Sequence, residues 1–335
     1  MSKSVFFVTL PKSGTTNTWN VCSESMGVPI PERLKGPAVG RRMNTGRCNF
    51  EGGWAVGDFV SQTINPENFS KQVGAAEIFG GHLPASSHNI QMLEESGLER
   101  LFLLIRDPRD ATVSWAHHVR SYGPEHRKHI SKFCHLPNGY YDWSDGEQLS
   151  FLVRTHLPQA VNWLESWLDY LASADRSIDI LLLYFDQLKR MPMEYFQSIS
   201  SFLRLPIDLS KVPQPKAGVM HYRKGSHRQW RDEFSEQDLQ FSELLLGTRL
   251  EKAYARAARG VAERRGLLTA LDCREETAAS HLVVEMVCMF PNDKWLLEIV
   301  SELFPGIDIP VIAHTSDLFL YREKLLEQLR RRTGS

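Results

Sequence analysis

Residues 5–16, VFFVTLPKSGTT, constrain the fold of this chain more than any other segment. An apolar run that breaks at Pro11 and continues into lysine, glycine and hydroxyl residues is typical of a strand leading through a phosphate-binding loop into a helix. Backbone N–H groups and the positive end of the helix dipole would face the anion, and Lys12 would add a charge. The lysine precedes Gly14, whereas it follows the glycine in the common nucleotide loop G-x-x-x-x-G-K-[ST]. The segment therefore predicts a bound phosphate ester in a loop of another type.

Further elements are predicted from apolar patterns along the chain. The runs at 101–105 and 178–184 are typical of strands buried on both faces of a parallel sheet. Between them, residues 149–171 carry apolar side chains at helical spacing. A helix is expected over 15–26, and loops with short helices over 27–79. The alternation predicts an α/β fold with a central parallel sheet flanked by helices, and a ligand beyond the carboxyl ends of the strands.

Charge and cysteine content restrict the class of protein. The net charge of −1 and the pI near 6.9 disfavour nucleic acid as a partner. No apolar stretch approaches the ~20 residues of a membrane span, and the first strand begins too early for a signal peptide. The five cysteines are odd in number and scattered, which favours free thiols in a reducing compartment. We therefore expect a cytoplasmic protein. The cysteines are Cys22, Cys48, Cys134, Cys273 and Cys288.

A second anion motif follows the strand predicted at 101–105. The next residues read RDPRDATVS, in which Arg106 and Ser114 could clamp a second phosphate from two directions. The alternative is a local network of arginines and aspartates in which Asp107 or Asp110 caps the next helix. A third segment, residues 221–231, gathers basic residues around a glycine and by itself is typical of a solvated charge cluster.

Together, PKSGTT, RDPRDATVS and RKG followed by a tryptophan resemble the cytosolic-type sulfotransferases, in the order of that family and over residues 1 to about 250. The resemblance implies a P-loop-like sulfotransferase fold and a donor, 3′-phosphoadenosine 5′-phosphosulfate (PAPS), whose two phosphates match the two anion motifs. No metal is implied, because the sulfuryl group carries less charge than a phosphoryl group and cationic side chains can suffice. By this resemblance the 5′-phosphate is held by Lys12, Ser13, Gly14, Thr15 and Thr16, the 3′-phosphate by Arg106, Ser114, Arg223, Lys224 and Gly225, and Tyr184 lies near the adenine.

The resemblance also implies a catalytic base. Residues 80–84, GGHLP, are similar to the T-H-L-P segment of the family, and His82 matches its catalytic histidine. In the implied mechanism the acceptor oxygen attacks sulfur in line, His82 removes its proton, and Lys12 stabilises charge on the leaving phosphate oxygen. His82, Lys12 and Ser114 are thus the predicted catalytic residues. Without the resemblance, a histidine before Leu-Pro is a structural loop residue.

The sequence departs from the family pattern at three places. The tryptophan that usually follows the two threonines and stacks on adenine is replaced by Asn17, so that either Trp19 substitutes for it or the adenine pocket differs. Gly80 stands where animal members commonly have lysine, and Arg228-Gln229 replaces glycine-aspartate after RKG. The dimer-forming stretch is not recognisable, and we predict no oligomeric state.

The predicted acceptor is a small-molecule alcohol or phenol. Aromatic residues on long loops suit a flat or apolar acceptor, although plain core packing explains them equally well. The alternatives are a carbohydrate hydroxyl as acceptor, a P-loop nucleotide-dependent phosphotransferase, and a non-catalytic sulfonucleotide-binding protein. The candidate pocket residues are Trp54, Phe59, Trp115, His117, Tyr122, Tyr140, Tyr141 and Trp143.

Two other features complete the sequence-based expectations. Histidines and a cysteine over residues 117–135 could suggest a metal site, but adjacent pairs cannot readily point at one ion, and a basic loop is the preferred interpretation. Long helical patterns begin at about residue 251. We predict a sulfotransferase domain over 1–255 and a helical C-terminal extension over 256–335.

Overall fold

The computed structural model describes residues 5–27, 50–51, 59–64, 66–73, 78–212, 228–247 and 249–264. The chain divides into two compact units. The first comprises Met1–Leu164 and Ser177–Ser242, and the second Glu165–Arg176 and Glu243–Ser335. The boundary predicted at residues 255 and 256 stays a prediction, since residues 265–335 lie outside the described part of the chain.

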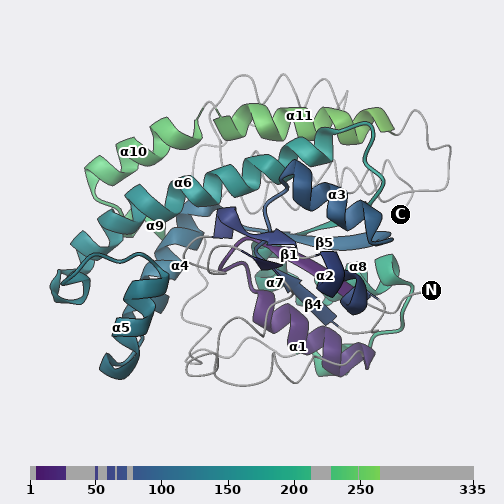
Figure 1. Cartoon of the computed structure of the whole chain (residues 1–335), viewed down its shortest axis with the longest axis horizontal. Coiled ribbons are helices and arrows are strands. Elements are labelled where there is room, and N and C mark those ends of the chain that lie inside the picture. Colours follow the sequence, from purple (N-terminus) through teal and green to yellow (C-terminus); the bar gives the residue numbers. More distant parts are fainter. Residues whose placement is uncertain are drawn as a thin grey trace. The chain divides into compact units, whose positions relative to one another are not determined.

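A parallel sheet of four strands forms the centre of the first unit (Figure 1). Its order is β4 (Ile78–Gly81), β1 (Val5–Thr9), β5 (Arg100–Ile105) and β6 (Asp179–Tyr184). The three strands predicted from apolar runs are confirmed, whereas β4 is a strand that the sequence patterns did not predict. The strand that follows β1 in this sheet, β4, lies on one side of it, and the strand that follows β5, β6, lies on the other side of β5. The direction in which strands are added therefore reverses between β1 and β5. In sheets of this kind ligands bind at that reversal, beyond the carboxyl ends of the strands.

Successive residues of β1 anchor the two faces of this sheet. The Phe7 ring stacks on Phe102 with centroids 4.7 Å apart and lies 6.4 Å from Trp19 of α1 (Thr15–Met26). Phe6 points to the opposite face and meets Phe69 of α2 (Pro66–Val73) edge-on at 5.2 Å. This alternation is the period of two that a strand imposes. Helices therefore cover both faces, as predicted for an α/β fold, with α1 below the strands and α3 (Ser87–Glu95) above them in Figure 1.

The other elements of the first unit are mostly helical. A small antiparallel pair precedes β4 in the region predicted to hold loops and short helices, so these two short strands were not predicted. The helix predicted over 149–171 is confirmed as part of α6. These elements are β2 (Phe50–Glu51), η2 (Phe59–Ser61), β3 (Thr63–Ile64), α4 (Pro108–Arg120), α5 (Pro124–Phe133), η3 (Tyr140–Asp142), α6 (Asp145–Ala172), α7 (Phe185–Arg190), α8 (Pro192–Leu203), η4 (Leu209–Lys211), α9 (Trp230–Glu233) and α10 (Glu236–Leu246). The last residues of α6 and α10 belong to the second unit.

The described part of the second unit pairs the end of α6 with α11 (Arg249–Arg264). Arg249 binds Glu165 at 2.5 Å, and Arg256 binds Asp169 at 2.5 Å. The helical pattern predicted from about residue 251 is confirmed over α11. No helix in the described ranges has both the length and the apolar character required to cross a membrane. Of the cysteines, Cys22 and Cys134 are described, and both are buried free thiols as predicted.

Candidate active site

The loop after β1 turns sharply before α1. Leu10 keeps the chain paired to β5 through an N–H bond to the Leu104 carbonyl at 2.9 Å. Lys12 and Gly14 then adopt left-handed backbone angles, with φ of 70° and 87°. A Cβ at Gly14 would lie 2.7 Å from Leu188 Cδ2 of α7, so only glycine fits there without a shift. The loop is therefore compact and lies directly against α7.

The N-terminus of α1 is arranged to receive an anion. Its N-cap residue is Gly14, which has no side chain to cap the helix. The first N–H groups of a helix have no intrahelical partner, and the helix dipole is positive there. Ser13 is 1% exposed, and its Oγ has no hydrogen-bond partner among the described residues. A phosphate group would accept hydrogen bonds both from the N–H groups at this helix start and from the buried Ser13 hydroxyl.

His82 is held against the strand that leads into this loop. Its Nδ1 lies 2.7 Å from the Thr9 carbonyl oxygen and 3.1 Å from Thr9 Oγ1. Thr15 Oγ1 in turn donates to Thr9 Oγ1 at 2.9 Å. Because a carbonyl oxygen can only accept, Nδ1 must carry the ring proton, which leaves Nε2 of the neutral imidazole as its basic nitrogen. The tautomer thus assigned is the one required of a base that acts through Nε2.

Trp163 of α6 fixes the peptide that carries His82. Its indole Nε1–H donates to the carbonyl oxygens of both His82, at 2.8 Å, and Leu83, at 2.9 Å. Trp163 is fully buried, and His82 is 5% exposed. The imidazole is therefore positioned from both sides, by β1 through its ring and by α6 through its backbone.

Arg106 lies at the carboxyl end of β5, beside the loop. Its Nη1 donates to the Lys12 carbonyl at 3.1 Å, and its guanidinium carbon lies 4.2 Å from the centre of the Phe185 ring. The ammonium of Lys189 lies 5.9 Å from the centre of the same ring. Burial and, to a smaller extent, the Arg106 charge lower the pKa of Lys189 to about 8, and the Asp186 carboxylate opposes this shift. The side chains of Arg106 and Lys189 thus both lie near the Phe185 ring, next to the loop after β1.

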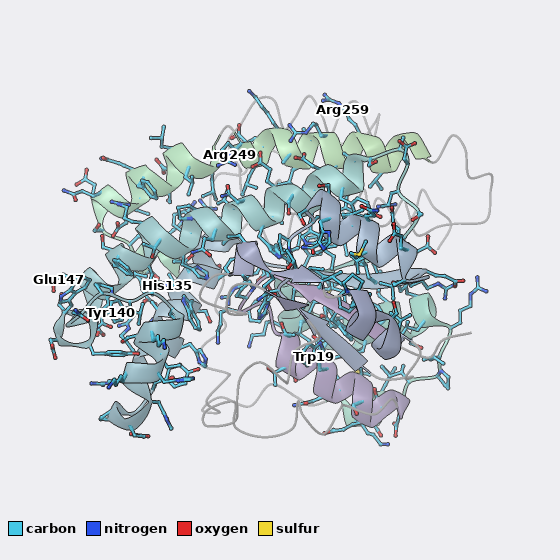
Figure 2. The ribbon with its side chains drawn as sticks, in the orientation of Figure 1. Trp19, His135, Tyr140, Glu147, Arg249 and Arg259 are labelled. Atoms are coloured by element: carbon cyan, nitrogen blue, oxygen red, sulfur yellow. The ribbon has the colours of Figure 1, made fainter. Side chains whose placement is uncertain are left out.

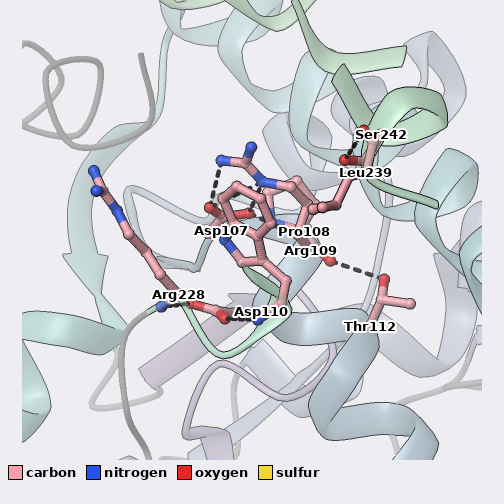
Figure 3. Close-up of polar contacts among 9 residues, drawn as sticks. Asp107, Pro108, Arg109, Asp110, Thr112, Arg228, Leu239 and Ser242 are labelled. Atoms are coloured by element: carbon pink, nitrogen blue, oxygen red, sulfur yellow. Dashed lines mark hydrogen bonds and ion pairs between the residues drawn. The ribbon is translucent and has the colours of Figure 1, made fainter. Parts of the chain in front are cut away.

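The residues after Arg106 form the network proposed as the alternative to a phosphate clamp (Figure 3). Asp107 caps α4 by accepting from the Arg109 N–H at 2.9 Å and also binds the Arg109 Nη2 at 2.7 Å. Asp110 accepts from the Arg228 N–H at 2.9 Å. The chain that follows the RKG segment is therefore tied to the start of α4. Arg109 thus forms the network, whereas Arg106 binds the loop, and the phosphate clamp by Arg106 and Ser114 stays a prediction.

The sequence matches the family described as "Sulfotransferase domain" over residues 2–252. The chain belongs to this family. It is also similar in structure to the crystal structure of mouse sulfotransferase SULT7A1 complexed with PAP, with 13% identity, a TM-score of 0.46, and coverage of 76% of this chain and 87% of that chain. The sequence has no significant match among curated proteins.

The structure brings most of the predicted sulfotransferase residues to one edge of the sheet. Residues 12–16 form the loop after β1, Arg106 binds that loop, and His82 binds Thr9 at its base. Ser114 is half-buried in α4, and Tyr184 ends β6 with 1% exposure. The predicted ligands Arg223, Lys224 and Gly225 lie outside the described residues, as does Trp54.

Trp19 is a core residue of this family member rather than a platform for adenine. It is 7% exposed and packs with Phe7 and Phe196 in one apolar cluster beneath the sheet (Figure 2). A stacking surface requires a ring face open to the ligand. The burial of Trp19 does not favour stacking on adenine, and a different adenine pocket stays a prediction.

The candidate acceptor residues fall into different environments. Phe59, Trp115 and Tyr140 are at most 2% exposed, so core packing describes them. His117 Nε2 pairs with Glu233 at 2.6 Å, and Tyr122 bonds to a neighbouring histidine of α4. Figure 2 shows Tyr140 far from Trp19 and close to α5. Tyr140 and Tyr141 line a cavity of about 410 Å³ with Arg127, Lys128, Ser131, Lys132, Leu136, Pro137, Asn138, Gly139 and Asp142.

Two other groups of residues are the histidines once considered for a metal site and a lysine near the loop. The described residues contain no group of three His, Cys, Asp or Glu side chains able to hold a metal ion, so a zinc site gains no support there. Lys189, in contrast, was not singled out, although it belongs to the charged cluster at the loop. The sequence does contain a signal for Lys189, because it lies one helical turn after the YFD at the end of a predicted strand.

Proposed function

We propose that this sulfotransferase-family protein transfers the sulfuryl group from PAPS to a hydroxyl of a small-molecule alcohol or phenol, with His82 as general base. Family membership supports sulfuryl transfer. The observation that carries the assignment of the base is the 2.7 Å contact between His82 Nδ1 and the Thr9 carbonyl. It joins the candidate base to the strand whose next residues form the anion loop.

In this proposal the loop holds the 5′-phosphate of the donor. The N–H groups of the first turn of α1 and the hydroxyls of Ser13 and Thr16 supply donors, and Lys12 supplies a charge. The Thr15 hydroxyl proton goes to Thr9, so Thr15 would contribute through its backbone N–H. Arg106, which precedes α4, and Ser114, in the second turn of that helix, would hold the 3′-phosphate with the RKG residues. The fit rests on the buried, unpartnered Ser13 Oγ at the uncapped helix start.

The chemistry of the transfer follows from the tautomer of His82. The acceptor oxygen attacks sulfur, and its proton passes to His82 Nε2 as the new S–O bond forms. The S–O bond to the 5′-phosphate breaks, and its electron pair stays on the phosphate oxygen. The Nδ1–H bond to Thr9 holds the ring and stabilises the imidazolium, a contribution of roughly 10²- to 10⁴-fold for a positioned base.

The leaving bisphosphate gains negative charge at the oxygen that carried sulfur. Lys12 and the start of α1 lie where this charge develops if the 5′-phosphate occupies the loop. Cationic side chains and backbone dipoles are already in place before the reaction, so they need little reorganisation. This is the role proposed for Lys12 in addition to binding.

The proposal is tested first by binding and then by turnover. In differential scanning with 3′-phosphoadenosine 5′-phosphate (PAP), AMP and ATP, PAP should stabilise the protein most, by about 2.7 kcal/mol at 100 times its Kd. A preference for ATP would overturn the donor assignment in favour of a phosphotransferase. Transfer of labelled sulfate from PAPS should then be measured on a panel of phenols, alcohols and saccharides. Binding of PAP without transfer to any hydroxyl would leave the non-catalytic alternative and overturn the enzymatic one.

A further inference from the structure

A cavity beside α5, called the α5 cavity below, lies outside the loop proposed to bind the donor. Its volume of about 410 Å³ is that of a site for a small organic molecule. One wall is the turn over residues 136–142, and the other is a face of α5 that carries Arg127, Lys128, Ser131 and Lys132. None of these residues belongs to the loop after β1.

The turn that closes the α5 cavity is held by the backbone. The Leu136 N–H donates to the Ser131 carbonyl of α5 at 2.9 Å, and the Asp142 N–H donates to the Gly139 carbonyl at 2.8 Å. Gly139 has a φ of 76°, a left-handed angle that glycine adopts without strain. Tyr140 is 1% exposed and anchors the turn in the core. Both walls are therefore in place without a ligand.

Cations dominate the lining of the α5 cavity. Arg127, Lys128 and Lys132 carry positive charge, whereas Asp142 is the one carboxylate among the lining residues. Within the described part of the chain, none of the three cations forms an ion pair with Asp142 or with another carboxylate. The whole chain has a net charge of −1, so these residues form a local concentration of positive charge around a hollow.

Tyr141 orients Arg127 but supplies no negative charge. Burial raises the pKa of Tyr141 to about 12, although the Arg127 charge opposes this shift, so the hydroxyl stays protonated at neutral pH. The Arg127 guanidinium carbon lies 4.7 Å from the centre of the Tyr141 ring, and its Nε donates to the Tyr122 carbonyl at 3.4 Å. These contacts leave the Nη groups of Arg127 without a hydrogen bond to the described residues.

We propose that the α5 cavity binds a small organic anion, a molecule with a sulfate, phosphate or carboxylate head group on an apolar body. The planar guanidinium of Arg127 donates two parallel hydrogen bonds to such a head group, and Lys128 and Lys132 add charge. Apolar contact with the body of the ligand comes from the other large side chains of the lining, which are Leu136, Pro137, Tyr140 and Tyr141.

This site goes beyond the proposed function, because it uses neither the donor loop nor the candidate base. Figure 2 shows Tyr140 of the α5 cavity far from Trp19, which belongs to the helix that follows the donor loop. An anion in the α5 cavity would therefore be bound in addition to the donor.

Calorimetric titration of the full chain with phenyl phosphate, phenyl sulfate, benzoate and phenol tests the inference. The three anions distinguish the head groups, and phenol is their neutral counterpart. At least one anion should bind about tenfold or more tightly than phenol, because hydrogen bonds to charged groups are the stronger ones. Equal affinity for phenol would overturn the requirement for an anion, and no binding of any of the three anions would overturn the site.

Variants then locate the bound anion. Arg127→Gln should weaken binding of the best anion about tenfold or more, and Arg127→Lys, which keeps the charge but not the planar fork, should fall between this variant and the wild type. Lys252→Met, at an exposed position of α11, is the control and should change the affinity less than about twofold. Unchanged affinity in Arg127→Gln would overturn the assignment to the α5 cavity.

Two measurements cover other failures. If Arg127→Gln does not fold, as shown by its thermal transition, the double variant Lys128→Gln/Lys132→Gln at exposed positions takes its place and should also weaken binding. Titration in the presence of saturating PAP should give the same affinity as without PAP, and displacement by PAP would overturn the inference by assigning the anion to the donor site. Failure of the protein to bind PAP would overturn the proposed function, while the variants would still test the α5 cavity.

Discussion

The Nδ1 of His82 contacts the carbonyl oxygen of Thr9 at 2.7 Å across 73 positions of sequence. Parallel pairing of β4 with β1 produces this contact, because it places the residue after β4 next to the last residue of β1. The candidate base and the anion loop are thus attached to the same strand end. The pairing of β1 with β4 therefore fixes the backbone before His82 relative to the start of the loop.

The first prediction concerns the base. Asparagine at position 82 can place its amide N–H near the position of Nδ1 and keep the bond to Thr9, but it offers no basic nitrogen. His82→Asn should therefore lower kcat by roughly 10²- to 10⁴-fold and leave the Kd for PAP nearly unchanged. Steady-state kinetics and calorimetry measure the two effects separately.

His88→Asn is the matched control, since His88 is exposed on α3. It should behave as wild type in both measurements. Unchanged turnover in His82→Asn would remove His82 from the mechanism.

The second prediction concerns the support of His82 by α6. Trp163→Phe keeps an aromatic ring but removes the N–H that binds the His82 and Leu83 carbonyls. Two buried carbonyls lose their donor, which should lower the free energy of unfolding by about 1–3 kcal/mol and reduce kcat without changing PAP affinity. Denaturant unfolding and kinetics check these outcomes. Trp143→Phe, in the half-buried aromatic group near α5, serves as a control for the unfolding measurement, and an equal loss of stability there would argue against a specific support through Trp163.

The third prediction separates backbone strain from steric overlap in the loop. Gly14 and Gly27 bracket α1, and both have positive φ, of 87° and 65°. A Cβ at Gly27 meets nothing within 4 Å, whereas one at Gly14 overlaps Leu188. Gly27→Ala should therefore cost about 1 kcal/mol of stability from strain alone, and Gly14→Ala clearly more.

Only Gly14→Ala should also abolish the stabilisation by PAP, because it displaces the loop from α7. Thermal unfolding with and without PAP provides both readouts. Equal losses in the two variants would show that α7 does not constrain the loop.

The fourth prediction is a pH dependence of stability that arises from His156. This residue is buried in α6 beside Phe59 and Trp115, and burial lowers its pKa from 6.5 to about 3. The folded state holds the ring neutral while the unfolded chain takes up a proton, so this contribution is complete above pH 6.5 and is lost as the pH falls toward 3. From pH 7.5 to pH 5 the loss should be about 2 kcal/mol.

Urea unfolding at the two pH values measures this loss. His156→Asn is less stable overall but should lose most of the difference between the two pH values, whereas the exposed His88→Asn should retain it. The same pH dependence in all three proteins would assign it to other groups.

Much of the fold was predictable because the signals are local. The strands β1, β5 and β6 are continuous apolar runs, which indicate strands buried on both faces of a sheet. Helix α6 shows apolar residues at helical spacing. Both signals come from residues that are neighbours in the sequence. The strand β4 was not predictable in this way, since its sequence IFGG contains two glycines. A Cβ at Gly80 would lie 2.1 Å from the Phe7 carbonyl oxygen. The glycine is required by the close approach of β1, which no local pattern reveals.

The sequence by itself determined which chemical groups are present and their order: an anion loop after the first strand, an arginine after another, and a histidine before Leu-Pro. Local composition sets these features. The tertiary structure decided which of them meet, placing His82 on Thr9, Trp19 in the core and Lys189 beside Arg106. The physical reason is that contacts across a parallel sheet join residues far apart in the chain, and burial and charge effects depend on those contacts rather than on sequence neighbours.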